Sequence, residues 1–143
     1  MITYEFLDQR LITDRNVDDI NLLLPQLTTS PTPLTSGDIE AIAGNARLLV
    51  ALDEKRSIKG MATLCVIIAP RGVKGIIEDV VVDAALCGRG IGTAFLIRLI
   101  AEARKFGAKK LELTSKPERM AANHLYQKLG FELRNTNHYR MNL

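Results

Sequence analysis

The sequence has little aromatic content and almost no cysteine. It has no tryptophan, 5% aromatic residues and two cysteines, Cys65 and Cys87, which lie far apart in the chain. Two separated cysteines indicate neither a disulfide framework nor a zinc site, and we expect no metal. With so few aromatic residues and no groove-reading motif, we expect no binding to nucleic acid.

Long hydrophobic runs are also missing. No apolar run approaches the roughly 20 residues that a membrane span requires, so we expect no membrane association. The segment "MITYEFLDQR" lacks the basic region and apolar region of a secretory signal, which favours a cytoplasmic protein. The length of 143 residues, 47% of them hydrophobic, fits one globular domain over 1–143.

Charge is distributed unevenly along the chain. Residues 1–83 contain 8 Lys and Arg against 12 Asp and Glu, a net charge of −4. Residues 84–143 contain 11 against 4, a net charge of +7. This asymmetry suggests two ligands of opposite charge that meet at a boundary, although charge also scatters by chance in small proteins.

The first half of the chain alternates strand and helix patterns. An N-terminal strand precedes a helix that Asn16 caps and Pro25 bends or ends. A second short helix, capped by Ser36, follows a proline-rich loop. Three apolar strands come next, and the third, over 75–83, is too apolar for an exposed edge.

The second half predicts helix, strand, helix and closing strands. The helix over 90–106 carries one apolar stripe, formed by Ile91, Phe95, Leu99 and Ala103. "KKLELTS" reads as a strand, "ERMAANHLYQKL" as a helix, and 131–143 as one or two closing strands. The order βααβββαβαβ predicts an α/β sheet with helices on both faces.

The stretch "CGRGIGTAF", residues 87–95, joins a strand to a helix. The first-turn N–H groups of a helix have no partner within the helix, and glycines remove the Cβ atoms that would hold a phosphate away. The stretch therefore predicts a site for phosphate or pyrophosphate. A nucleotide P-loop would need a lysine that is missing here, and a dinucleotide fingerprint would need glycine where Thr93 stands, although Glu112 has the spacing of a ribose-binding acid.

Two segments carry a family resemblance. "VVVDAALCGRGIGTAFLIRLI" resembles the coenzyme A-binding region of the GNAT superfamily of acetyltransferases, with Gly90 and Gly92 at its two small positions. "RMAANHLYQKLGFEL" is similar to the late helix and strand of that family. Cys87 departs from the arginine or glutamine that the family has at its position.

The resemblance implies a particular fold and a cosubstrate. The GNAT fold is a mixed, mostly antiparallel sheet of about six to seven strands that is splayed at strand 75–83. Acetyl-CoA would be the cosubstrate, with no metal. The residues implied in binding it are the backbone of Val80, Val81 and Val82, the loop residues Cys87, Gly88, Arg89, Gly90, Ile91, Gly92 and Thr93, and the later residues Arg119 and Asn123.

The resemblance also implies acyl transfer to an amine. The amine must lose a proton, the carbonyl oxygen needs stabilisation, and the leaving thiolate needs a proton. Tyr126 matches the family acid, and a phenol suits this task because its unperturbed pKa of about 10 lies slightly above that of a thiol. Glu78 is the candidate base, with Asp79 as its competitor if a bulge exchanges their faces.

The acceptor is not identified by the sequence. Asp18, Asp19, Asp38 and Glu40 hint at a cationic acceptor, yet carboxylates are also favoured at helix starts. His138 and Tyr139 could reach the acceptor pocket or a partner subunit, so a homodimer is one of the alternatives. The sequence thus favours an N-acetyltransferase that moves acetyl from acetyl-CoA directly to a primary amine of a small molecule or peptide. Its rivals are a non-catalytic acyl-CoA sensor or interaction module and a nucleotide-binding protein.

Overall fold

The computed structural model describes residues 1–143, which divide into two compact units. The first unit runs from Met1 to Leu113 and contains the sheet, and the second runs from Thr114 to Leu143. No helix in either unit combines the length and apolar character needed to cross a membrane.

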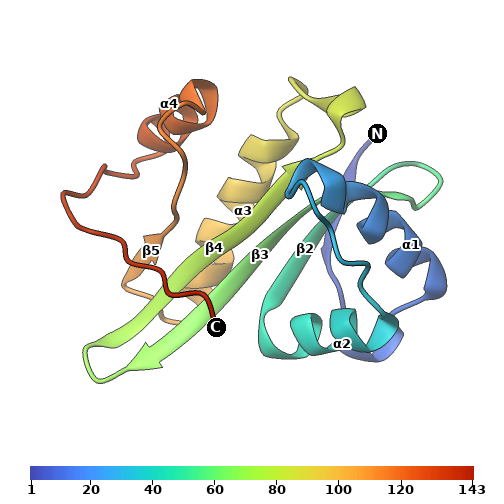
Figure 1. Ribbon diagram of the computed structural model, residues 1–143, viewed down its shortest axis with the longest axis horizontal. Helices are drawn as coiled ribbons and strands as arrows, with labels where there is room; N and C mark the ends of the chain where they lie inside the picture. Colours follow the sequence, from blue (N-terminus) through green and yellow to red (C-terminus); the bar gives the residue numbers. More distant parts are fainter. The chain divides into compact units, whose positions relative to one another are not determined.

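The first unit is built on a five-stranded sheet in the order β1-β2-β3-β4-β5 (Figure 1). The first four strands pair antiparallel, whereas β5 is parallel to β4 because a helix carries the chain between them. The strands are β1 (Thr3–Phe6), β2 (Arg47–Leu52), β3 (Ile58–Ala69), β4 (Gly72–Val82) and β5 (Lys110–Glu112).

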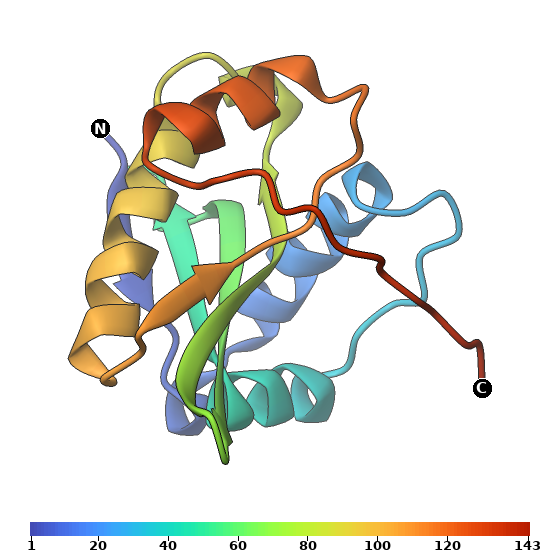
Figure 2. The ribbon, with the colours of Figure 1, turned by 90° about the vertical axis from the view of Figure 1, so that its left-hand side faces the viewer.

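Helices cover both faces of this sheet, as the sequence predicts. Figure 2 shows α1 (Asp14–Leu23) and α2 (Ser36–Asn45) on one side and α3 (Ile91–Lys105) on the other. Three short 3-10 helices complete the unit: η1 (Gln9–Leu11), η2 (Leu24–Gln26) and η3 (Ala84–Leu86). Pro25 lies in η2, directly after α1, so the predicted end of the first helix is confirmed.

The N-cap residue of α1 and of α2 is a threonine that precedes the predicted cap. Thr13, not Asn16, caps α1, and Thr35, not Ser36, caps α2. Both helices form capping boxes, in which the threonine hydroxyl accepts from the third-residue N–H while that residue's side chain accepts from the threonine N–H. Asn16 and Asp38 are these third residues, so Asp38 has a capping role at the start of its helix.

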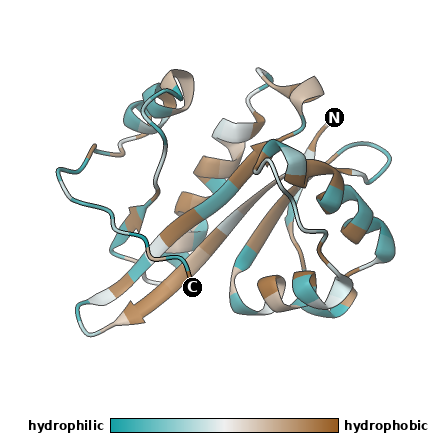
Figure 3. Ribbon diagram, in the orientation of Figure 1, coloured by the Kyte–Doolittle hydropathy of each residue, from teal (hydrophilic) through white to brown (hydrophobic).

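Apolar residues fill both layers between sheet and helices. Hydrophobic colour predominates along β2 and β3 (Figure 3). The predicted stripe on α3 is buried: Phe95 and Leu99 are fully covered, and Ile91 and Ala103 nearly so. Ile20, Ile39, Leu48 and Val81 belong to the separate cluster under α1 and α2.

The second unit contains α4 (Met120–Lys128), which ends before Gly130 as expected. Residues 131–143 form no strand, so the expected closing strands are wrong, and the sheet has five strands instead of six to seven. This segment has little to bury: all of 132–143 is exposed, and its composition is polar with no valine or isoleucine.

Candidate active site

The second half of β4 departs from regular strand geometry. Glu78 pairs with Thr63 and Val81 pairs with Met61, so β4 has one residue more than β3 in this interval. This is a β-bulge. Asp79 lies in this bulge. Its φ of 51° is in the left-handed region, which Asp adopts more readily than most residues.

The bulge reverses the alternation of side chains along β4. Gly75 lies near Ala103 of α3, and Ile77 shares its face, whereas Val81 packs in the cluster under α1 and α2. Glu78 lies opposite Thr63 on the α1 and α2 face. Asp79 lines a cavity together with Thr63 and residues of α1 and α2, so the two candidate bases share this side of the sheet, and both are exposed.

One edge of β4 is open beyond the bulge. β5 pairs only with Lys74–Ile76, so the rest of β4 has no sheet partner on that edge. Asp83 donates its N–H to the Lys59 carbonyl at 2.8 Å, in register with the Met61–Val81 pair. By strand alternation, the backbone groups of Val80 and Val82 therefore point toward the open edge. The family resemblance implies a splay at strand 75–83, and the open edge lies within this strand.

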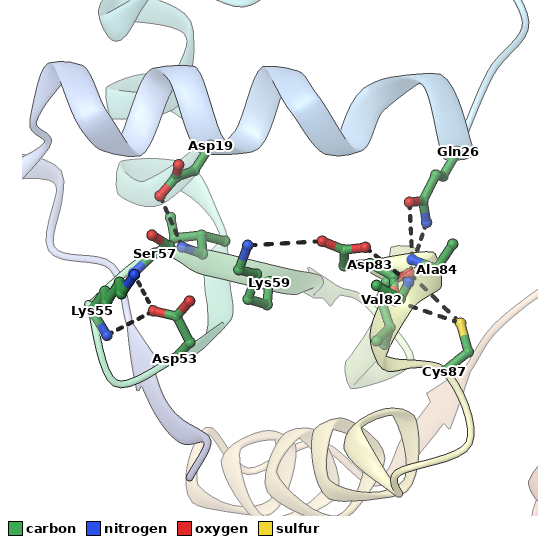
Figure 4. A network of polar contacts seen from close by, with 12 residues as sticks. Asp19, Gln26, Asp53, Lys55, Ser57, Lys59, Val82, Asp83, Ala84 and Cys87 are labelled. Atoms are coloured by element: carbon green, nitrogen blue, oxygen red, sulfur yellow. Dashed lines mark hydrogen bonds and ion pairs between the residues drawn. The ribbon is translucent and has the colours of Figure 1, made fainter.

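A side chain from η2 fixes the end of β4 (Figure 4). Gln26 donates from Nε2 to the Val82 carbonyl at 2.7 Å and accepts at Oε1 from the Ala84 N–H at 3.1 Å. Lys59 lies 3.9 Å from Asp83 beside it. Sequence reasoning missed Gln26, because its partners are more than 50 residues away along the chain.

The glycine loop follows η3 and opens α3. Gly88 and Gly90 have φ of +81° and +78°, which favour glycine over any other residue. Apart from adjacent residues and the nearby backbone of α3, no atom lies within 4 Å of a Cβ built on Gly88, Gly90 or Gly92, so the loop borders open space. α3 begins with no side-chain cap and no acidic residue in its first turn, which leaves its N–H groups for an anion.

The loop side chains differ in what they offer. Arg89 is exposed and carries positive charge next to the helix start, whereas Ile91 is buried and presents only its backbone. Cys87 is exposed, and its Sγ lies 3.9 Å and 3.7 Å from the carbonyls of Val82 and Asp83. The thiol thus donates weakly toward the strand end. The uncapped N–H groups, the open space and Arg89 together fit a pyrophosphate.

A small cavity lies beside the bulge. α1, η2, α2 and the sheet enclose about 60 Å³, and the lining is apolar except for Thr63 and Asp79. None of the candidates for recognising a cationic acceptor, Asp18, Asp19, Asp38 and Glu40, lines this cavity, and Asp19 instead accepts the Ile58 N–H at 2.9 Å. The acidic residue that lines the cavity, Asp79, therefore comes from β4.

Cys65 shares the neighbourhood of these carboxylates. Burial raises the pKa of its thiol, and the negative charges of Glu78 and Asp79 raise it further. A thiol held protonated in this way is a poor nucleophile.

The remaining candidates lie on α4 in the second unit. Tyr126 is half-buried, with its ring edge against Phe131 at 6.1 Å between centroids. Burial raises the pKa of its phenol, against the opposing effect of the Arg119 charge. The hydroxyl is therefore protonated at neutral pH and able to donate. Asn123 donates to the carbonyls of Lys116 and Pro117, so its amide holds the loop before α4.

Comparison with known proteins decides the family. The model of the Acetyltransferase (GNAT) family matches residues 19–131, most of the chain. The chain belongs to the GNAT family.

Two curated GNAT relatives come from Oryza sativa subsp. japonica. "Glucosamine 6-phosphate N-acetyltransferase 1" is 36% identical over 79% of this chain, and "Probable glucosamine 6-phosphate N-acetyltransferase 2" is 35% identical over 75%. The chain spans 73% and 66% of their respective lengths. The crystal structure of a Trypanosoma brucei acetyltransferase is 27% identical, covers both chains fully and gives a TM-score of 0.80. The family resemblance, the fold class and the acyltransferase class that the sequence predicts are thereby confirmed.

Proposed function

We propose that this GNAT protein transfers the acetyl group of acetyl-CoA to a primary amine. The observation that carries this proposal is the bulged, open end of β4 directly before the glycine loop. These two features lie in one compact unit, and they offer backbone donors for an amide-containing arm and for a pyrophosphate. The family match extends across the boundary at Leu113, which supports one functional domain over 1–143.

Acetyl-CoA would supply an acetyl group activated as a thioester. In the proposal, the N–H groups from Gly88 to Thr93 hold its pyrophosphate, with Arg89 adding positive charge. The backbone of Val80 and the N–H of Val82 at the open edge hold its amide-containing arm, since the Val82 carbonyl already accepts from Gln26. The roles of Val81, Arg119 and Asn123 in binding remain those that the resemblance implies.

The chain's carboxylates would remove the proton from the amine. The sequence favours Glu78 with Asp79 as its competitor. The cavity lining supports Asp79, because Asp79 is the one charged residue in it, and the left-handed backbone of Asp79 is a feature often found at active sites. Glu78 lies next to it on the same side of the sheet and can act through water.

Tyr126 would donate the proton that the departing sulfur needs. The match of Tyr126 to the family acid supports this role, and its phenol is protonated at neutral pH and can donate. Direct transfer is supported by Cys65, whose raised pKa argues against an acetyl-cysteine intermediate at that residue.

The test is thiol release from acetyl-CoA in the presence of a mixture of primary amines. The proposal predicts amine-dependent release, and Tyr126→Phe should slow the chemical step roughly 10²-fold or more with little change in acetyl-CoA binding. Tyr4→Phe is the matched control, since Tyr4 packs on Phe95 and has no proposed catalytic role. Binding of acetyl-CoA without turnover would point to the sensor instead.

A further inference from the structure

The cavity beside Asp79 has a lining suited to aliphatic groups. Eight of its ten lining residues are aliphatic or methionine, and they come from α1, η2, the following loop, α2, β2 and β3. Leu24, Leu27, Leu34 and Ile42 are only partly buried, so they form the part of this apolar wall nearest to solvent. Such a wall favours a hydrocarbon group over a hydroxyl-rich ring, because polar groups buried there would lose their hydrogen bonds.

The size of the cavity narrows the choice of ligand. Its volume is about 60 Å³. An engineered apolar cavity of about 150 Å³ holds benzene, so this one suits a smaller group, such as a short or branched alkyl chain.

The charge of the cavity lining narrows the choice of ligand further. Asp79 is the single charged residue in the lining, and no lysine or arginine lines the cavity. A phosphate placed there would face a carboxylate without a cation beside it, whereas an ammonium group would be attracted. The cavity thus offers one negative group at the border of an apolar space.

We propose that the acceptor is a primary amine carried by a small aliphatic group, either a free alkylamine or the aliphatic amino-terminal residue of a peptide. This inference rests on the proposed function. In the transfer, the amine nitrogen bonds to the acetyl carbon and the thioester C–S bond breaks. The ammonium loses two protons, of which one ends on the sulfur and one in solvent. The proposal differs from the amino sugar phosphate in the names of the two rice relatives.

A panel of acceptors tests the proposal in the full-length protein. The panel contains isobutylamine, a peptide with amino-terminal leucine, the same peptide with a blocked amine, and glucosamine 6-phosphate. We expect kcat/KM for isobutylamine or the free peptide to exceed that for glucosamine 6-phosphate at least about tenfold, since hydrophobic pockets discriminate on this scale. The ratio of the first two rates separates the two sources of the amine.

Two outcomes overturn different claims. A higher kcat/KM for glucosamine 6-phosphate than for every aliphatic amine would refute the proposed acceptor class and leave the proposed function standing. Absence of thiol release with all amines would overturn the proposed function, and the acceptor class with it.

Variants of the lining sharpen the test. Leu34→Lys places a cation at the apolar wall and should raise KM for the aliphatic amine about tenfold or more, with KM for acetyl-CoA unchanged. Leu22→Lys is the matched control, because Leu22 is 76% exposed and lies outside the cavity. Ile42→Val, a milder change that keeps the fold, should enlarge the cavity and shift the preference toward a longer alkyl chain. Equal KM values for the amine in Leu34→Lys, Leu22→Lys and the unmodified protein would refute the assignment of the cavity.

Discussion

The two halves of β4 both pair with β3 and differ in their second edge, their regularity and their exposure. The half from Gly72 to Ile77 pairs with β3, pairs with β5 along Lys74–Ile76, and buries Gly75 and Ile77. The half from Glu78 to Val82 contains the bulge, has an open edge and exposes two carboxylates. The difference teaches that a strand can be anchored by one half while the other half stays available for ligands.

The largest effect is expected from the carboxylates of the open half. Asp79→Asn should lower kcat/KM about 10²–10⁴-fold, because it removes the base at the cavity without removing buried contacts. The loss should be greatest at moderate pH and partly relieved at high pH, where free amine accumulates. Steady-state kinetics across pH measure this, and Glu78→Gln is the matched variant. A severe loss of kcat/KM in Glu78→Gln, together with unchanged kcat/KM in Asp79→Asn, would assign the role of the base to Glu78.

The next effect concerns the half of β4 from Gly72 to Ile77. Ile77→Ala should lower the free energy of unfolding by about 2–5 kcal/mol, because Ile77 is 3% exposed and leaves a cavity behind. Val82→Ala in the open half should cost less, since Val82 is only half-buried. Denaturant unfolding of both variants measures the contrast, and equal losses would erase the distinction between the two halves.

A smaller effect is expected at Cys87, where the open half meets the glycine loop. Cys87→Arg should retain activity and tighten acetyl-CoA binding by at most about 1.5–3 kcal/mol, the value of a charge-assisted hydrogen bond. Calorimetry measures this. Acetyl-CoA should also slow alkylation of Cys87 in the unmodified protein. An unaltered alkylation rate under saturating acetyl-CoA would place the pyrophosphate away from this loop.

The smallest effect concerns the pH dependence of stability, at Asp53. The Ser57 N–H bonded to Asp53, in the turn that leads to β3, is the main cause that lowers the pKa of this carboxyl. Because the folded-state pKa lies below the unfolded value, this stabilisation is present above about pH 4 and is lost as the pH falls through the folded-state pKa. Asp53→Asn should flatten the dependence of unfolding on pH in that window, and Glu54→Gln next to it is the control.

Local patterns allowed much of this to be predicted. The stripe of α3, the glycine loop and the stop at Gly130 depend on neighbours along the chain, and the structure has them where expected. The bulge at Asp79 depends on the register between β3 and β4, and the contact of Gln26 with Val82 joins distant segments, so neither has a local signal. The closing strands were expected from the sequence of residues 131–143, and that prediction is wrong because residues 132–143 lack the β-branched apolar residues that would bury a strand.

Hydrogen exchange with and without saturating acetyl-CoA tests most directly whether the open half of β4 and the glycine loop bind the cosubstrate. We predict slower exchange of the amides of Val80, Val82 and residues 88–93, with no change at residues 74–76, which β5 already covers. Unchanged exchange at the open edge and the loop, under conditions where acetyl-CoA binding is confirmed by calorimetry, would contradict the proposed site.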